Sequence, residues 1–183
     1  MEFARTQGKG MSRIATPVLA RSIQQVRAMT LAQKELLLDD MFRSQPTLLS
    51  ACIVQHRMGI PFEKMEFLME MILICFQTMQ ESGLTWPLID ENQWERQLGL
   101  LVANVKFTEG LSNDLHRQSL QQHIEGHPEK MLFAFVMGEL LPWLDQCGLA
   151  EDHERYVMLA AITAVNCIAN VPMPPVKKTK KSK

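Results

Sequence analysis

Apolar residues recur at spacings of three and four along most of this chain, which is the pattern of helices that bury one face. The stretch from Phe67 to Phe76 is apolar apart from Glu70, and the stretch from Tyr156 to Ala169 is apolar nearly all round. We expect both helices to lie centrally, and the second to be the hub of a helical bundle.

Glycine marks most of the predicted helix ends. It stands just past a helical pattern at Gly59, Gly83, Gly110, Gly126 and Gly148. Because glycine has no Cβ, it adopts the left-handed conformation that commonly closes a helix. Start signals agree, since Thr30 with Gln33 and Asp90 with Gln93 resemble capping boxes.

These signals predict helices over residues 17–28, 31–44, 46–58, 61–82, 91–108, 113–125, 128–147 and 151–170, and the first could continue into the second. The fold class is therefore all-α, an irregular single-domain bundle of six to eight helices. Uneven glycine spacing argues against a repeat solenoid. We expect a flexible basic segment over 1–16, the helical domain over 17–171, and a disordered Pro/Lys-rich tail over 172–183.

Two helices carry further expectations. One side of the helix 61–82 is polar, and we expect it to face solvent. Its members are Glu63, Glu66, Glu70, Gln77 and Glu81. Pro142 removes a backbone donor inside the helix 128–147, so we expect a kink or break near Glu139.

Charge is unevenly distributed along the chain. The formal net charge is −1, yet residues 1–27 hold five basic groups and one acid, and residues 177–183 hold five lysines and no acid. Residues 28–176 therefore carry a net charge of −10. An acidic body with two basic ends is the clearest electrostatic feature of the sequence.

The cysteines and the last helix bear on location. Cys52, Cys75, Cys147 and Cys167 lie far apart in apolar helical contexts. We expect four buried, reduced thiols, no signal peptide and a cytoplasmic protein. A membrane anchor is disfavoured, because prolines from Pro172 onward stop the last apolar helix at the lower limit of a membrane-spanning length.

Histidines gather in one region, at His116, His123 and His127. The first two share a helix face, whereas His127 follows Gly126 at a predicted helix junction. Convergent imidazoles can bind a metal, so a metal-dependent helical enzyme is one hypothesis. The spacing is not that of a His-Glu-x-x-His motif, and no nucleophile or phosphate-loop motif occurs. We therefore expect no cofactor and lean against an enzyme.

A lysine cluster closes the chain, at Lys177, Lys178, Lys180, Lys181 and Lys183. Such a cluster can contact nucleic acid electrostatically, so a nucleic-acid-associated factor with basic arms is a second hypothesis. The alternative is a solvated tail without a partner.

Methionine is abundant, with 13 residues in 183, and a group surrounds the helix 61–82. It comprises Met58, Met65, Met69, Met71 and Met79. Methionine fills irregular gaps in cores, and it also lines grooves that accept a partner helix. Our leading hypothesis is a non-enzymatic protein–protein interaction module (an adaptor, regulator or chaperone-like protein), with Met65, Met69 and Met79 in contact with another protein.

Overall fold

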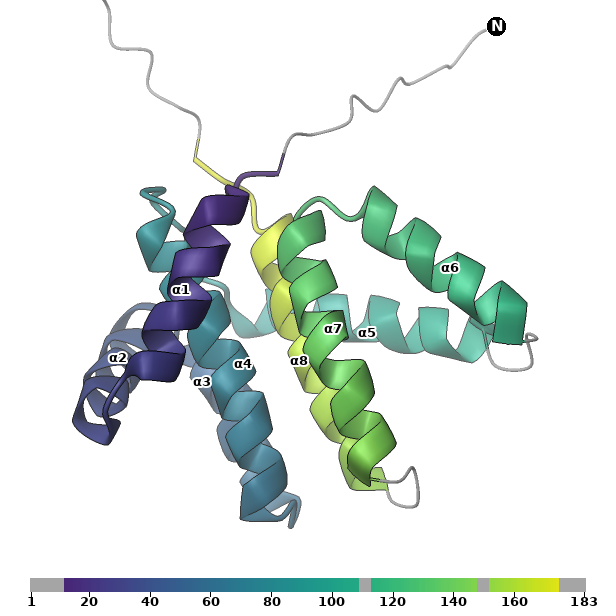
Figure 1. Ribbon diagram of the computed structural model, residues 1–183, viewed down its shortest axis with the longest axis horizontal. Coiled ribbons are helices and arrows are strands. Elements are labelled where there is room, and N and C mark those ends of the chain that lie inside the picture. Colours follow the sequence, from purple (N-terminus) through teal and green to yellow (C-terminus); the bar gives the residue numbers. More distant parts are fainter. Residues whose placement is uncertain (1–11, 109–112, 148–151, 175–183) are drawn as a thin grey trace, which may run out of the picture.

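The computed structural model describes residues 12–108, 113–147 and 152–174, and within these ranges it contains helices and no strand (Figure 1). The helices are α1 (Thr16–Ala28), α2 (Leu31–Ser44), α3 (Pro46–Arg57), α4 (Phe62–Glu81), α5 (Glu91–Thr108), α6 (Asn113–Gly126), α7 (Lys130–Cys147) and α8 (Asp152–Asn170). The predicted all-α bundle is confirmed. Most of the segments 1–16 and 172–183 lie outside the described residues.

Helix α8 is the hub of this bundle, as predicted. It contacts α3, α4, α5 and α7, and α5 passes across it at a large angle (Figure 1). Val157, Ala161, Val165 and Ile168 of α8 are all buried. Small side chains such as Ala160 and Ala164 let neighbouring helices approach this apolar surface closely. Burial of the larger apolar side chains of α8 stabilises the fold.

Local capping signals explain most helix boundaries. Thr30 and Gln33 form the predicted capping box, in which Gln33 N donates to Thr30 Oγ1 at 3.3 Å and Thr30 N donates to Gln33 Oε1 at 2.8 Å. This cap separates α1 from α2. Gln93 N likewise donates to Asp90 Oδ1 at 2.7 Å, ahead of the first turn of α5.

Two of the predicted glycine caps are confirmed and one is wrong. Gly59 has φ of 81° and Gly83 has φ of 69°, both left-handed. Gly126 does not adopt this conformation and is instead the last residue of α6. The helix ends there in a tighter turn, in which His127 N donates to Ile124 O, three residues earlier, at 3.2 Å. This turn does not require a left-handed residue. Gly110 and Gly148 lie outside the described residues.

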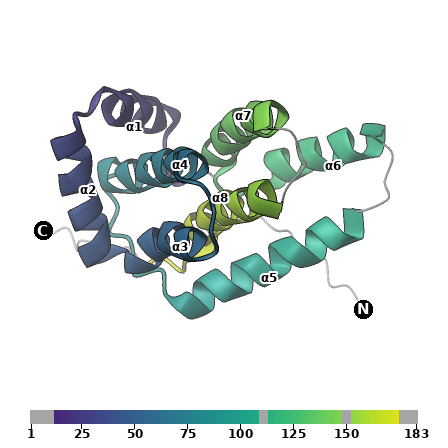
Figure 2. The ribbon, with the colours of Figure 1, turned by 90° about the horizontal axis from the view of Figure 1, so that it is seen from below.

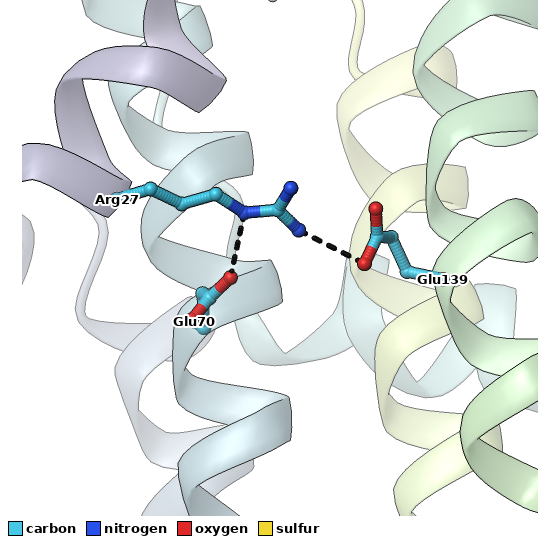
Figure 3. A network of polar contacts seen from close by, with 3 residues as sticks. All are labelled: Arg27, Glu70 and Glu139. Atoms are coloured by element: carbon cyan, nitrogen blue, oxygen red, sulfur yellow. Dashed lines mark hydrogen bonds and ion pairs between the residues drawn. The ribbon is translucent and has the colours of Figure 1, made fainter.

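The polar stripe of α4 does not face solvent along its whole length, which corrects the prediction. Helix α1 packs on α4 and covers part of the stripe. Arg27 of α1 bridges two carboxylates, with Nε 3.0 Å from Glu70 Oε1 and Nη2 2.9 Å from Glu139 Oε2 of α7 (Figure 3). Gln77 is buried, and its Nε2 donates to Gln25 Oε1 at 3.1 Å.

The predicted break in α7 does not occur, because the helix continues through Pro142 to Cys147. Pro142 cannot donate to the carbonyl of Gly138, one turn earlier. Both residues are exposed, so water can satisfy that carbonyl. The missing hydrogen bond therefore lies on the solvent side of α7 and is tolerated.

A buried carboxylate ties the first described residues to the rest of the bundle. Glu129, only 1% exposed, accepts hydrogen bonds from Arg13 N at 2.9 Å, from Ile14 N at 3.2 Å and from Ser12 Oγ. The guanidinium of Arg13 donates to two backbone carbonyls at the end of α8, to Val171 O at 3.1 Å and to Ala169 O at 2.9 Å. We call these contacts the terminal clasp. It joins the N-terminal segment, the start of α7 and the end of α8.

The terminal clasp and the Arg27 bridge should differ in their effect on stability. Glu129→Ala leaves two backbone N–H groups without an acceptor, and each such loss costs about 1–3 kcal/mol. Arg27→Met breaks a partly exposed bridge and should cost less than about 1 kcal/mol. Chemical denaturation would measure both free energies of unfolding. Glu129→Gln, which keeps one acceptor oxygen, is the control, and its free energy of unfolding should lie between those of Glu129→Ala and the wild type. If Arg27→Met lost more stability than Glu129→Ala, the terminal clasp would not be the stronger of the two interactions.

Candidate functional site

Helix α5 separates two cavities, because its two flanks line different spaces. Residues 91, 94, 95, 98 and 102 lie on one flank and residues 96, 97, 100, 101 and 104 on the other, both at helical spacing. The first flank faces α3 and the second faces α6, and α8 contributes to both cavities.

The first cavity, which we call the apolar groove, has a volume of about 520 Å³. It lies among α3, α5 and α8, and its apolar wall includes Val54, Met58, Trp94, Leu98, Val102 and Leu159. Val54 and Met58 are 47% and 44% exposed, although both are apolar. When a partner covers an apolar wall of this kind, apolar surface is removed from water, and this stabilises the complex.

The groove exists because α3 and α5 begin together and then diverge. Gln45, buried at the start of α3, donates from Nε2 to Pro87 O at 2.8 Å and accepts from Ile89 N at 2.9 Å. Ile89 lies just before α5, so one side chain holds the two helix starts together. In Figure 2, α3 is seen nearly end-on and α5 runs across the view; α8 supplies the third side of the groove through Tyr156, Leu159 and Ala160.

The charged side chains that line the groove are negative, and its unpaired buried polar atom is a hydrogen-bond acceptor. Glu91 and Glu95 are its charged lining residues, and both are exposed. Gln55 also lines it, and the buried Gln55 Oε1 has no hydrogen-bond partner within the described part of the chain. The groove thus presents acceptors and negative charge beside its apolar wall.

The second cavity, which we call the polar cavity, has a volume of about 490 Å³. It lies among α5, α6, α8 and the junction before α7. Its polar side chains include Arg96, Gln97, Gln122, His123 and Asn166. None of the described residues that line it is acidic, which contrasts with the net charge of −10 over residues 28–176.

The imidazole of His127 is fixed at the edge of the polar cavity. Its Nδ1 accepts from Glu129 N at 3.2 Å, so Nε2 carries the proton and donates to Asn166 Oδ1 at 3.1 Å. The ring stacks on Phe133 with centroids 4.5 Å apart. Burial is the largest influence on this side chain and lowers the pKa of His127.

These contacts bear directly on the predicted metal ligands. His123 lies close to His127, with ring centroids 6.0 Å apart, but both nitrogens of His127 are already engaged. The side chain of His116 lies outside those described. No group of three or more His, Cys, Asp or Glu residues suited to a metal occurs in residues 12–108, 113–147 and 152–174.

The methionines predicted to contact a partner occupy different environments. Met79 is a core residue, 2% exposed, which corrects its assignment to a surface. Met65 and Met69 are half-buried on α4 and pack against the core. Met58 is the member of the group that lines the apolar groove. The spacing of Ala51, Val54 and Met58 along α3 is the sequence signal that could have identified this wall.

The remaining predictions concern the thiols and the tail. Cys52, Cys75 and Cys167 are buried, and burial raises the pKa of each thiol to about 12. Cys147 is exposed at the end of α7, so the prediction of four buried thiols is wrong for this residue. The five lysines of residues 177–183 lie outside the described residues. Of the helices described, none has the length and apolar character needed to cross a membrane.

The pKa shift of His127 predicts a pH-dependent stability. Because its pKa in the folded state is below the ordinary value of 6.5, the unfolded chain binds the proton first as the pH falls. The free energy of unfolding should therefore decrease as the pH drops below about 6.5 and should level off below the folded pKa. Denaturation curves between pH 5 and 8 would measure this slope.

His127→Gln is the variant that isolates this titration, because every other ionisable side chain is present in both proteins. The stability of His127→Gln should change less between pH 7.5 and pH 5.5 than that of the wild type. His123 and Glu129, the nearest titratable groups, are unchanged in this comparison. Parallel pH profiles for the two proteins would refute the buried, neutral imidazole.

Comparison of the chain with protein-family models, with curated proteins and with solved structures found no match in any of the three. The apolar groove and the polar cavity are therefore the features from which a function can be proposed.

Proposed function

We propose that this protein is a non-enzymatic interaction module that binds an amphipathic helix of another protein in the apolar groove. The observation that carries the proposal is the apolar wall shared by α3, α5 and α8, on which Val54, Met58 and Tyr156 are exposed. Helix-in-groove recognition places apolar residues of the ligand, spaced by three and four, into such a trough. Met58 adds an adaptable side chain to the wall.

The dimensions of the groove fit a short helix. Its α3 wall extends from Thr47 to Met58. At 1.5 Å rise per residue this wall is about 17 Å long, or roughly three helical turns. A ligand helix of about that length would present two or three apolar anchors to Val54, Leu98 and the α8 floor.

Charge complementarity favours a basic ligand helix. Glu91 and Glu95 border the groove, and the body around it is acidic. Lysine or arginine beside the apolar anchors would meet these carboxylates at the rim and would increase the association rate.

We further propose that binding takes place in a reducing compartment such as the cytoplasm. The four cysteines are all free thiols, and three of them are buried within helices packed in the core. Such thiols are typical of proteins that remain in a reducing environment.

A designed peptide tests the proposed function. The probe is a fluorescently labelled helix of about 14 residues with leucines spaced by three and four and lysines on the opposite face. The wild-type protein should bind it saturably in fluorescence anisotropy. Val54→Glu and Leu98→Glu, which add charge to the groove wall, should each weaken binding by at least about tenfold, or roughly 1.4 kcal/mol.

Leu36→Glu is the matched control. Leu36 is a 65% exposed leucine on α2 and does not line the groove, so its replacement should leave the affinity unchanged. A second peptide with glutamates in place of the lysines should bind more weakly at low salt. Equal affinity of the lysine peptide for Val54→Glu and Leu36→Glu, or no binding to the wild type, would reject the groove as the site.

A further inference from the structure

The polar cavity on the other flank of α5 is a second site with different chemistry. Among the described residues its lining includes one arginine, several amides and two histidines, but no acid. The nearby acid of α6, Glu125, is exposed and accepts a hydrogen bond from Gln121 Nε2 at 3.2 Å; it does not line the cavity. In an acidic protein, a cavity whose described lining holds an arginine and no carboxylate is locally suited to a negatively charged ligand.

Gln97 presents the first unused hydrogen-bonding group. Its side chain lines the cavity, and its amide group makes no hydrogen bond with any described residue. An amide at the wall of an open cavity is hydrogen-bonded by water, and a ligand that offers a matching group can replace that water. Gln97 is therefore available to a ligand.

Asn166 presents the second such group, and its orientation is determined by His127. Because His127 Nε2 carries the proton, the oxygen of Asn166, and not its nitrogen, lies on the His127 side. Asn170 Nδ2 donates to the backbone carbonyl of Asn166 at 2.8 Å and does not contact its side chain. Asn166 Nδ2 makes no hydrogen bond with a described residue. The NH₂ group of Asn166 is therefore a donor available to the cavity.

Arg96 supplies the charge. Its exposed guanidinium lines the cavity and makes no ion pair with the acids of the described ranges. A guanidinium binds carboxylate and phosphate groups through paired N–H donors. The cavity volume of about 490 Å³ lies within the range usual for small-molecule sites, about 300–1,000 Å³.

We infer that the polar cavity binds a small organic anion, with Arg96 contacting its carboxylate or phosphate group and the amides of Gln97 and Asn166 donating hydrogen bonds to it. This site is separate from the apolar groove, because the two cavities have no described lining residue in common. It is also distinct from a metal site, since His127 uses both nitrogens within the protein.

Titration of the ¹⁵N-labelled full chain with three probes tests this inference by NMR. The probes are inorganic phosphate, succinate and glycerol, added at constant ionic strength and pH. Saturable shifts of the side-chain amide signals of Gln97 and Asn166 are expected with phosphate, with succinate or with both, and none with glycerol. Phosphate alone would identify a phosphoryl ligand, and succinate alone would identify a carboxylate ligand.

Three variants make the result specific. Arg96→Gln should weaken binding of the active probe by at least about tenfold, because a charge-assisted hydrogen bond is lost. Asn166→Asp retains an acceptor for His127 but replaces the donor with a negatively charged oxygen, so it should abolish binding. Arg57→Gln, at an exposed arginine of α3 outside the cavity, should have no effect.

The inference fails on either of two results. One is the absence of saturable shifts with both anions in the folded wild type. The other is an affinity in Arg96→Gln equal to that in Arg57→Gln. Arg96 is exposed, so its replacement should not unfold the protein. The affinities of Arg96→Gln and Arg57→Gln can therefore be compared even if Asn166→Asp is unstable.

Discussion

The burial of α8 is the constraint on which the rest of the structure depends. A helix that is apolar on nearly every side must be covered by neighbours, and α3, α4, α5 and α7 provide that cover. α5 crosses α8 at a large angle (Figure 1), so it leaves space on both of its flanks. Both cavities are consequences of how one helix is covered.

A buried polar side chain near the border of each cavity positions the residues that line it. Gln45 holds the starts of α3 and α5 together by hydrogen bonds at 2.8 and 2.9 Å, which determines where the apolar groove begins. His127 directs Asn166 toward the polar cavity. Buried groups of this kind are costly when unsatisfied, so their hydrogen bonds favour one specific arrangement of the helices.

Helix boundaries were predictable because they depend on local signals. The Thr30–Gln33 box, the Asp90 cap and the left-handed Gly59 act within a few residues of sequence. Gly126 was the exception, since a tight turn at His127 replaced the expected cap.

The environments of individual residues were not predictable, because they depend on partners distant in sequence. Gln77 is buried by α1, and Glu129 is satisfied by residues more than a hundred positions earlier in the chain. Periodicity places a side chain on a helix face, but it does not say which helix covers that face. The apolar groove was missed for the same reason: Met58 and Leu98 belong to helices far apart in sequence, and their proximity follows from the packing on α8.

The exposure of the groove wall decides which kind of occupant it suits. A small molecule in a protein site has most of its surface buried, typically 70–90%. The apolar groove instead leaves Val54, Met58 and Tyr156 each more than a third exposed, spread over two of its three helices. Covering such a spread-out wall requires an extended apolar face, which an amphipathic helix has and a compact ligand lacks. The polar cavity differs, because its polar side chains converge: Gln97 and Asn166 come from different helices and line the same space. Spread apolar area favours a helix on one flank of α5, and convergent polar groups favour a small anion on the other.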